Sequence, residues 1–206
     1  MKDGICYIVG AGENYGLDFT PSPADLVIAA DGGLRYLQQQ DLQPQIIIGD
    51  FDSLGTAPQG EAVIVLPKEK DVTDTWAAME EGIRLGYGHF VLYGCTGGRF
   101  EHTLANVQTA ANAAQRGMTC RIMDRTQIIE ALCCGTRTFS ADHTGYLSVF
   151  SHTDRCSGVT LRGLKYQLEN AELTNGFPLG VSNEFIGKES TVTVGSGTVI
   201  LIYDRL

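Results

Sequence analysis

Short apolar runs alternate with helix-like segments over the first 124 residues, and this alternation restricts the fold to a few classes. Apolar runs typical of strands occupy residues 5–9, 26–30, 46–49, 63–66, 90–93 and 119–123. Helical spacing, ended by glycine or proline, predicts helices over residues 34–40, 74–85 and about 100–116. Strands that alternate with helices favour a mostly parallel sheet with helices on both faces. We therefore predict an α/β, Rossmann-like domain over residues 1–124.

The remaining residues, 125–206, carry no helical pattern, and their β-branched runs are short and broken by glycine. These runs are residues 145–150, 158–161, 191–194 and 198–203. The last two flank Gly195-Ser196-Gly197, which is typical of the turn of a hairpin. Many short strands in a small segment favour an antiparallel sandwich or barrel. We predict a smaller all-β sandwich domain over residues 125–206.

The charge balance narrows the choice of partners. The chain has 206 residues, with 15 Lys and Arg against 24 Asp and Glu, a formal net charge of -9. Non-specific binding to nucleic acid needs basic residues to neutralise phosphates, so we expect no nucleic-acid partner. No apolar run approaches membrane-spanning length and no charged-then-apolar leader is present, so we expect no membrane partner and a cytoplasmic location.

The cysteine pattern also favours a reduced compartment. The six cysteines, at positions 6, 95, 120, 133, 134 and 156, include no C-x-x-C pair. A zinc site built from Cys133, His143, His152 and Cys156 is conceivable, but the paired short spacings of structural zinc are missing. Free thiols of a reduced cytosol explain the pattern better.

Acidic clusters follow four of the expected strands. They are Asp31-Gly32-Gly33, Gly49-Asp50-Phe51-Asp52-Ser53, Lys70-Asp71-Val72-Thr73-Asp74 and Gly97-Gly98-Arg99-Phe100-Glu101-His102. Ligands of open α/β sheets bind at the carboxyl ends of the strands, so parallel strands would bring these clusters to one rim. Crowded carboxylates repel each other unless a divalent cation neutralises them. The clusters together therefore indicate metal-assisted chemistry on a phosphate compound.

Each acidic cluster also has a purely structural explanation. Alternate side chains of an extended segment share a face, so Asp50 and Asp52 can face one cation, but Asp is also a common turn residue. Asp71, Thr73 and Asp74 precede a strong helix, where Thr and Asp are ordinary caps. The clusters become hard to explain as turns only when they are taken together.

The glycine turn at positions 97 and 98 precedes the longest expected helix. Backbone N–H groups of Gly98 and its neighbours can bind a phosphate at a helix N-terminus. Arg99, His102 and Asn106 fall on one stripe of this helix and can bind phosphate oxygens or lie on a solvent face. Gly10-Ala11-Gly12 after the first strand is too short for a dinucleotide fingerprint.

In this order and spacing, the four clusters resemble the motifs of thiamine pyrophosphokinases (thiamine diphosphokinases). The resemblance continues with Gly163-Leu164-Lys165-Tyr166-x-Leu168 and Gly180-Val181-Ser182-Asn183-Glu184, and so spans nearly the whole chain. It implies that the hydroxyl of thiamine attacks the β-phosphorus of ATP, giving thiamine diphosphate and AMP with Mg²⁺ as cofactor. Transfers of this type depend mainly on positioning and charge neutralisation.

The resemblance also implies roles for residues. It implies Mg²⁺ ligands at Asp50, Asp52 and Asp74, with Asp71 near the reacting phosphates. ATP and phosphate contacts are expected from Asp31, Lys70, Gly98, Arg99, His102 and Asn106. The family pairs two chains into a homodimer whose thiamine site lies between the subunits, and here Tyr166, Ser182 and Asn183 would contribute to it. The chain departs from the family with Glu101 where Asp is usual and with Tyr166 where some relatives carry Trp.

Two other functions compete with this interpretation. An aspartyl-nucleophile phosphatase would use Asp50 to attack and Asp52 as acid/base, but that class differs from this chain at Gly49 and Leu54. A non-catalytic thiamine-binding protein is the other alternative, but a passive binder of a cation has no need for a magnesium site built from Asp50, Asp52 and Asp74.

Overall fold

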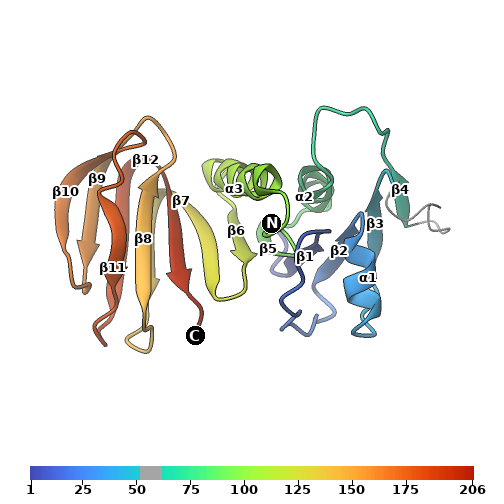
Figure 1. The fold of residues 1–206 in the computed structure, drawn as a ribbon, viewed down its shortest axis with the longest axis horizontal. Coiled ribbons are helices and arrows are strands. Elements are labelled where there is room, and N and C mark those ends of the chain that lie inside the picture. The colour runs from blue at the N-terminus through green and yellow to red at the C-terminus, as the bar shows by residue number, and fades with distance from the viewer. Residues whose placement is uncertain (52–61) are drawn as a thin grey trace. The chain divides into compact units, whose positions relative to one another are not determined.

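The structure of the protein is a computed structural model that describes residues 1–51 and 62–206 (Figure 1). Contacts group the chain into two compact units. The first unit comprises Met1–Thr109 and Ile122–Arg125, and the second comprises Ala110–Arg121 and Thr126–Leu206. Parallel and antiparallel strand pairs both occur, so the protein is α/β with mixed strand pairing and few helices.

The first unit contains a parallel sheet. Its strands are β1 (Ile5–Val9), β2 (Leu26–Ala30), β3 (Ile46–Gly49), β4 (Val63–Val65) and β5 (His89–Tyr93), and β6 (Thr119–Met123) has residues in both units. The strands pair in the order β5-β1-β2-β3-β4, and each of these pairs is parallel. All five residues of β2 are buried, as expected for the centre of a sheet covered on both faces. The carboxyl ends of these strands therefore share one rim.

Helices cover both faces of this sheet. The helices are α1 (Gly33–Gln38), α2 (Asp74–Arg84) and α3 (Phe100–Gln115), and α3 has residues in both units. Leu34 and Leu37 of α1 pack in one cluster with Tyr7 of β1. Gly82 of α2 lies so close to Cys6 that an added Cβ would stand 2.9 Å from its Sγ. Since Cys6 and Tyr7 point to opposite faces, α1 and α2 lie on opposite sides.

The second unit contains antiparallel strands. They are β7 (Gln127–Phe139), β8 (Tyr146–Ser151), β9 (Arg155–Arg162), β10 (Leu168–Thr174), β11 (Gly180–Glu184) and β12 (Ser190–Asp204). The long β12 pairs with β7 along its length, with β9 near its start and with β8 near its end. Strand β10 pairs with β9, and β11 pairs with β8. The core consists of inward-facing side chains from these strands, among them Phe139, Leu147, Leu161 and Leu201.

The hairpin predicted around Gly195-Ser196-Gly197 is wrong. Residues 190–204 form the single strand β12, which stays paired with β7 on both sides of these glycines. Val194 pairs with Gly135 and Thr198 pairs with Cys133, so β12 carries the longer segment between these pairs. The glycines therefore mark a β-bulge, which inserts extra residues without reversing the chain.

Within residues 1–51 and 62–206, no helix is long and apolar enough to cross a bilayer.

Candidate active site

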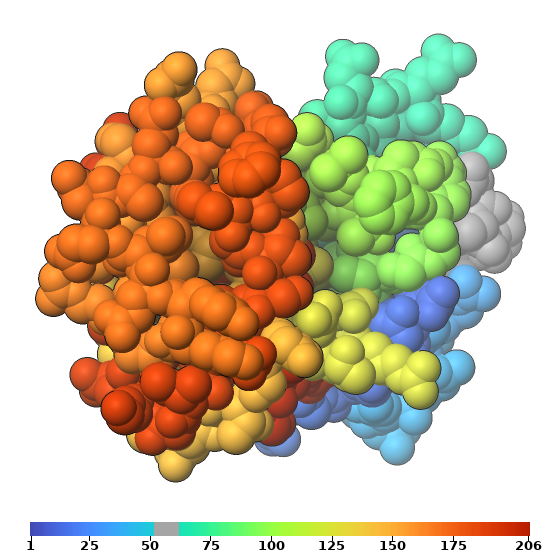
Figure 2. All heavy atoms as spheres, turned by 60° about the vertical axis from the view of Figure 1, so that its left-hand side comes forward, coloured from blue at the N-terminus to red at the C-terminus, as the bar shows by residue number. Residues whose placement is uncertain are grey.

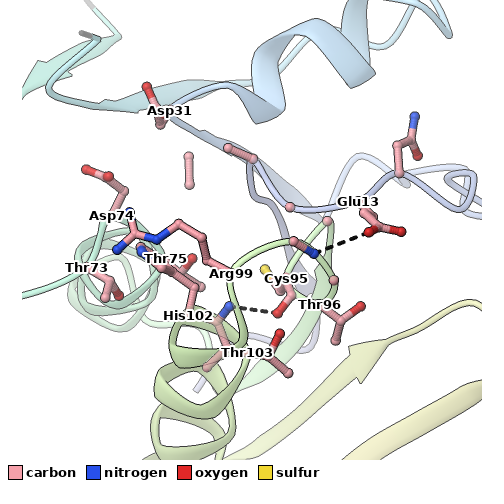
Figure 3. Close-up of a pocket in the computed structure, with 18 of the residues that line it drawn as sticks. Glu13, Asp31, Thr73, Asp74, Thr75, Cys95, Thr96, Arg99, His102 and Thr103 are labelled. Carbon is pink, nitrogen blue, oxygen red and sulfur yellow. Dashed lines mark hydrogen bonds between the residues drawn. The ribbon is translucent and has the colours of Figure 1, made fainter. Parts of the chain in front are cut away.

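A cavity of about 660 Å³ lies in the first unit where the strands end (Figure 3). Loops after β1, β2 and β5 and the first turns of α2 and α3 supply its walls. Six of the residues expected to bind ATP or metal line it: Asp31, Asp74, Gly98, Arg99, His102 and Asn106. These residues of the strand-end clusters therefore lie at one rim, as expected.

The side chains of Asp50 and Asp74 both contact the ammonium group of Lys70. The Lys70 ammonium lies 2.8 Å from Asp50 Oδ2 and 3.1 Å from Asp74 Oδ1. Asp50 follows β3, while Asp74 is the first residue of α2. Thr73 caps that helix by accepting the Trp76 N–H at 3.1 Å, which fixes the backbone at Asp74. The predicted helix cap and the predicted convergence of acids are therefore both present.

The electrostatics of this cluster reflect burial and crowding. Burial raises the pKa of the Asp74 carboxyl above its ordinary value, the nearby Lys70 opposes this, and the charges of Asp50 and Asp31 add to it. Burial alone would lower the pKa of Lys70, but its contacts with Asp50 and Asp74 raise it. The Asp74 carboxyl is thus subject both to the Lys70 ammonium and to the negative charges of Asp50 and Asp31.

The donor set of this cluster suits a hard divalent cation. Asp74 Oδ1 is buried, and its charged partner is the Lys70 ammonium at 3.1 Å. A buried carboxylate oxygen is costly unless a cation neutralises it. Within residues 1–51 and 62–206, no group of three or more His, Cys, Asp or Glu forms a ready metal cluster. Asp52, the third expected ligand, lies outside the described residues.

The glycine turn before α3 differs from its expected use. Gly97 and Gly98 have φ values of 75° and 57°, which glycine adopts without strain. The Gly98 N–H, expected to bind phosphate, donates to Glu13 Oε1 at 3.2 Å. Tyr15 donates to the other carboxylate oxygen of Glu13 at 2.8 Å. The Tyr15 hydroxyl, followed by the Gly98 N–H, lowers the pKa of Glu13.

Glu13 was not anticipated from the sequence. Figure 3 shows it on the opposite side of the view from Asp31 and Asp74. It follows β1 just as Asp31 follows β2, so the strand-end argument would have included it. The preceding segment Gly10-Ala11-Gly12 was interpreted only as a possible dinucleotide fingerprint, and the acid that follows it was not considered.

The stripe on α3 divides into two kinds of residue. Asn106 is buried and donates to the Cys95 carbonyl at 2.8 Å, so it anchors the turn after β5 rather than lying on a solvent face. His102 is exposed and lines the cavity. Arg99 donates to Glu101 Oε1 at 2.7 Å, and both side chains are largely exposed. An ion pair this exposed contributes little to stability.

Asp71 lies beside a second, smaller hollow of the first unit. The hollow has a volume of about 290 Å³ and is lined by Asp71, Val72, Thr73, Trp76 and part of α3. An acidic group beside an indole ring is an environment that suits an aromatic cation.

The three expected thiamine residues lie in the second unit. Asn183 is buried, accepts the Tyr166 N–H at 2.9 Å and donates to the Tyr166 carbonyl at 2.6 Å. Tyr166 as a whole residue is 59% exposed. Ser182 is exposed, adopts a φ of 56° and donates its N–H to Ser148 Oγ at 3.0 Å. Asn183 thus positions Tyr166, while Tyr166 and Ser182 remain open to a ligand.

The conceivable zinc site is not assembled. Cys133, His143, His152 and Cys156 all belong to the described residues, among which no metal-binding group of three appears. All six cysteines are free thiols.

The fold and site define an α/β protein whose ligand cavity lies at the carboxyl ends of parallel strands, beside a cluster of aspartates. The sequence matches the family model "Thiamin pyrophosphokinase, catalytic domain" over residues 20–122. It also matches "Thiamin pyrophosphokinase, vitamin B1 binding domain" over residues 138–199. The chain therefore belongs to the thiamin pyrophosphokinase family.

Individual relatives agree with this assignment. The thiamine pyrophosphokinase of Bacillus subtilis (strain 168) is 29% identical over 184 residues, covering 86% of each chain. A crystal structure of thiamine pyrophosphokinase from Bacillus subtilis superposes with a TM-score of 0.85 at 27% identity, covering 98% of this chain and 99% of that one. A crystal structure of thiamin pyrophosphokinase from Geobacillus thermodenitrificans superposes with a TM-score of 0.83 at 29% identity, covering 98% of both chains.

Proposed function

We propose that this chain performs its family's reaction with the aspartates at the strand rim and the open surface of its β-rich part. The hydroxyl oxygen of thiamine attacks the β-phosphorus of ATP, and the bond between that phosphorus and the oxygen bridging to the α-phosphate breaks. The products are thiamine diphosphate and AMP, and the hydroxyl proton is released. The convergence of Asp50 and Asp74 on Lys70, beside the cavity, is the observation that supports this most directly.

We assign Mg²⁺ to Asp50, Asp52 and Asp74, because Asp50 Oδ2 and Asp74 Oδ1 already share one cation, the Lys70 ammonium. Bound there, Mg²⁺ would neutralise phosphate charge. Asp31 lines the same cavity and adds to the negative potential that attracts the ion.

Basic groups of the chain would position the polyphosphate. Lys70 already lies between the two carboxylates, and Arg99 lines the cavity. Both can turn to phosphate oxygens when ATP enters, because charge-assisted hydrogen bonds to phosphate are strong. Gly98 would contribute its N–H once Glu13 is exchanged for a phosphate oxygen. His102 is the remaining exposed polar side chain of the α3 stripe.

The thiamine site would form between two copies of the chain. In the first unit, the exposed Val72 lines the acidic hollow at Asp71, and Phe100 and Leu104 of α3 are exposed apolar side chains as well. In the second unit, residues 164–186, orange in Figure 2, expose Tyr166, Phe177, Leu179, Val181 and Ile186. Exposed apolar side chains gathered in this way are typical of interaction surfaces. A homodimer would cover them and leave Tyr166 and Ser182 facing thiamine.

The remaining expectations fit this proposal. A Rossmann-like domain over residues 1–124 would hold ATP, and a β-sandwich domain over residues 125–206 would hold thiamine. The parallel and antiparallel strand pairs of the two segments support that division. We expect the enzyme to act in the cytoplasm.

Incubation of the chain with ATP, Mg²⁺ and thiamine tests the function. Equal amounts of AMP and thiamine diphosphate are expected, detected by chromatography. Inorganic phosphate without AMP, together with an aspartyl-phosphate analogue trapped by beryllofluoride, would indicate a phosphatase. Thiamine binding without turnover would indicate a passive binding protein.

A further inference from the structure

Two adjacent thiols in β7 lie on the same side of the chain. Successive side chains of a strand normally point to opposite faces. Cys134 has a φ of 48°, in the left-handed region, which interrupts this alternation. As a result, Cys133 Sγ and Cys134 Sγ lie only 3.7 Å apart.

The opposite strand makes room for this pair. The bulge of β12 lies directly across from it, between the pairs Val194–Gly135 and Thr198–Cys133. The Cys134 thiol approaches the carbonyl of Gly197 in this bulge at 3.8 Å. Gly197 has a φ of 94°, and an added Cβ there would stand 2.8 Å from Cys156 Sγ, so a glycine is required.

Cys133 and Cys134 are also more accessible to solvent than the other cysteines. Cys134 is exposed and Cys133 is half-buried, while the other four cysteines are buried. A disulfide between adjacent residues would be strained, because their Cα atoms lie about 3.8 Å apart and disulfides usually need about 4.4–6.8 Å. A larger atom between the sulfurs would relieve that strain.

We propose that Cys133 and Cys134 form a binding site for a thiophilic divalent cation, of the class of Zn²⁺ and Cd²⁺, held by both sulfurs as a dithiolate. Two sulfurs that each lie about 2.3 Å from a tetrahedral ion are about 3.8 Å apart, which matches the observed pair. Binding forms two metal–sulfur bonds and releases the two thiol protons to solvent. No oxidant or reductant takes part.

The site has an open coordination sphere. Over residues 1–51 and 62–206, no third His, Cys, Asp or Glu joins the pair in a metal-binding group. Solvent would therefore complete the tetrahedron, which is typical of exchangeable rather than structural sites. Because the cation needs both thiols deprotonated, affinity should increase as the pH rises.

Titration of the reduced chain with Cd²⁺ tests the site. We expect one bound ion per chain, with thiolate-to-metal charge-transfer absorption in the ultraviolet. Cys133→Ser and Cys134→Ser should each weaken Cd²⁺ binding by about a hundredfold, because the single remaining sulfur of the pair cannot chelate the ion. Cys156→Ser, which changes the neighbouring buried thiol, should leave binding unchanged.

Thermal unfolding of each variant shows whether it has folded, and Cys134→Ala serves as a second variant at the exposed position. Absence of Cd²⁺ binding to the folded wild-type chain would refute the proposal. So would equal binding by wild type and both single serine variants, or loss of binding in folded Cys156→Ser alone.

Discussion

Asp50 and Asp74 meet on one ammonium, because Lys70 Nζ lies 2.8 Å from Asp50 Oδ2 and 3.1 Å from Asp74 Oδ1. The distance between Asp50 Oδ2 and Asp74 Oδ1 therefore cannot exceed the sum of these two contact distances. A strand end and a helix start thus deliver two acids to one point, where a single ammonium contacts both. Such an arrangement stabilises the fold poorly but suits a cation, as expected where function outweighs stability.

The first prediction concerns these two acids. Asp50→Asn and Asp74→Asn should each lower kcat by about a thousandfold, because a metal ligand contributes several kcal/mol of transition-state stabilisation. The measurement is AMP formation at saturating ATP, Mg²⁺ and thiamine. Asp142→Asn, which removes an exposed acid in the second unit, is the matched control and should leave kcat unchanged. Near-normal turnover in both site variants would remove Asp50 and Asp74 from the metal site.

The second prediction separates two neighbours in the second unit. Ser182→Ala should raise the KM for thiamine and leave the KM for ATP unchanged, because Ser182 is an exposed residue of the expected thiamine site. Asn183→Ala should instead lower thermal stability as well as thiamine affinity, since its amide holds both backbone groups of Tyr166. Steady-state kinetics with each substrate varied in turn, together with melting curves, distinguish the two. Equal changes in both KM values for Ser182→Ala would contradict its placement at the thiamine site.

The first half of the fold was predictable because its signals are local. Periodicity located β1, β2, β3 and β6 to the residue, and the expected helices differ from α1, α2 and α3 by one or two residues at their ends. Strands β7, β10 and β11 were not anticipated. Strand β7 includes Glu130, Arg137 and a Cys-Cys-Gly segment, so its apolar pattern is irregular. Gly195-Ser196-Gly197 was mistaken for a turn because the long partner strand that converts it into a bulge is distant in sequence.

The site was predictable in outline but not in its contacts. The strand-end rule brought Asp31, Asp74 and Arg99 to one cavity. It could not reveal that Glu13 binds the Gly98 N–H, because that contact joins loops after β1 and β5. It also could not reveal that Asn106 is committed to the Cys95 carbonyl, since helical spacing gives a direction but no partner.

The third prediction explains one glycine of the Asp31-Gly32-Gly33 motif by packing. A Cβ added at Gly33 would stand 1.9 Å from the Val9 carbonyl oxygen, a backbone atom that cannot move aside. Gly33→Ala should therefore destabilise the chain by about 1–3 kcal/mol, the usual cost of overpacking. Urea unfolding measures this. Gly176→Ala, where an added Cβ meets nothing within 4 Å, is the control and should be nearly neutral. Equal stability of the two variants would show that the backbone at Gly33 can relax.

The fourth prediction concerns Asp25, which ties β1 to the segment before β2. Its two carboxylate oxygens accept the N–H groups of Ile5 and Ser22, each at 2.7 Å. Burial alone would raise the pKa of Asp25, but these two hydrogen bonds outweigh it and the pKa is lowered. A carboxyl whose pKa is lower in the folded than in the unfolded state stabilises the fold when it is ionised. That stabilisation is present above the unfolded pKa of about 3.9 and is lost as the pH falls through the folded value.

Asp25→Asn should consequently cost about 1.5–3 kcal/mol of unfolding free energy at neutral pH, the range for hydrogen bonds to a charged group. The difference from wild type should stay constant down to about pH 5 and shrink below about pH 4. Urea unfolding of both proteins across this range measures it, with Asp142→Asn as a control for the loss of an exposed charge. A difference that does not change with pH would mean that the carboxylate charge at Asp25 contributes nothing to the strand contact.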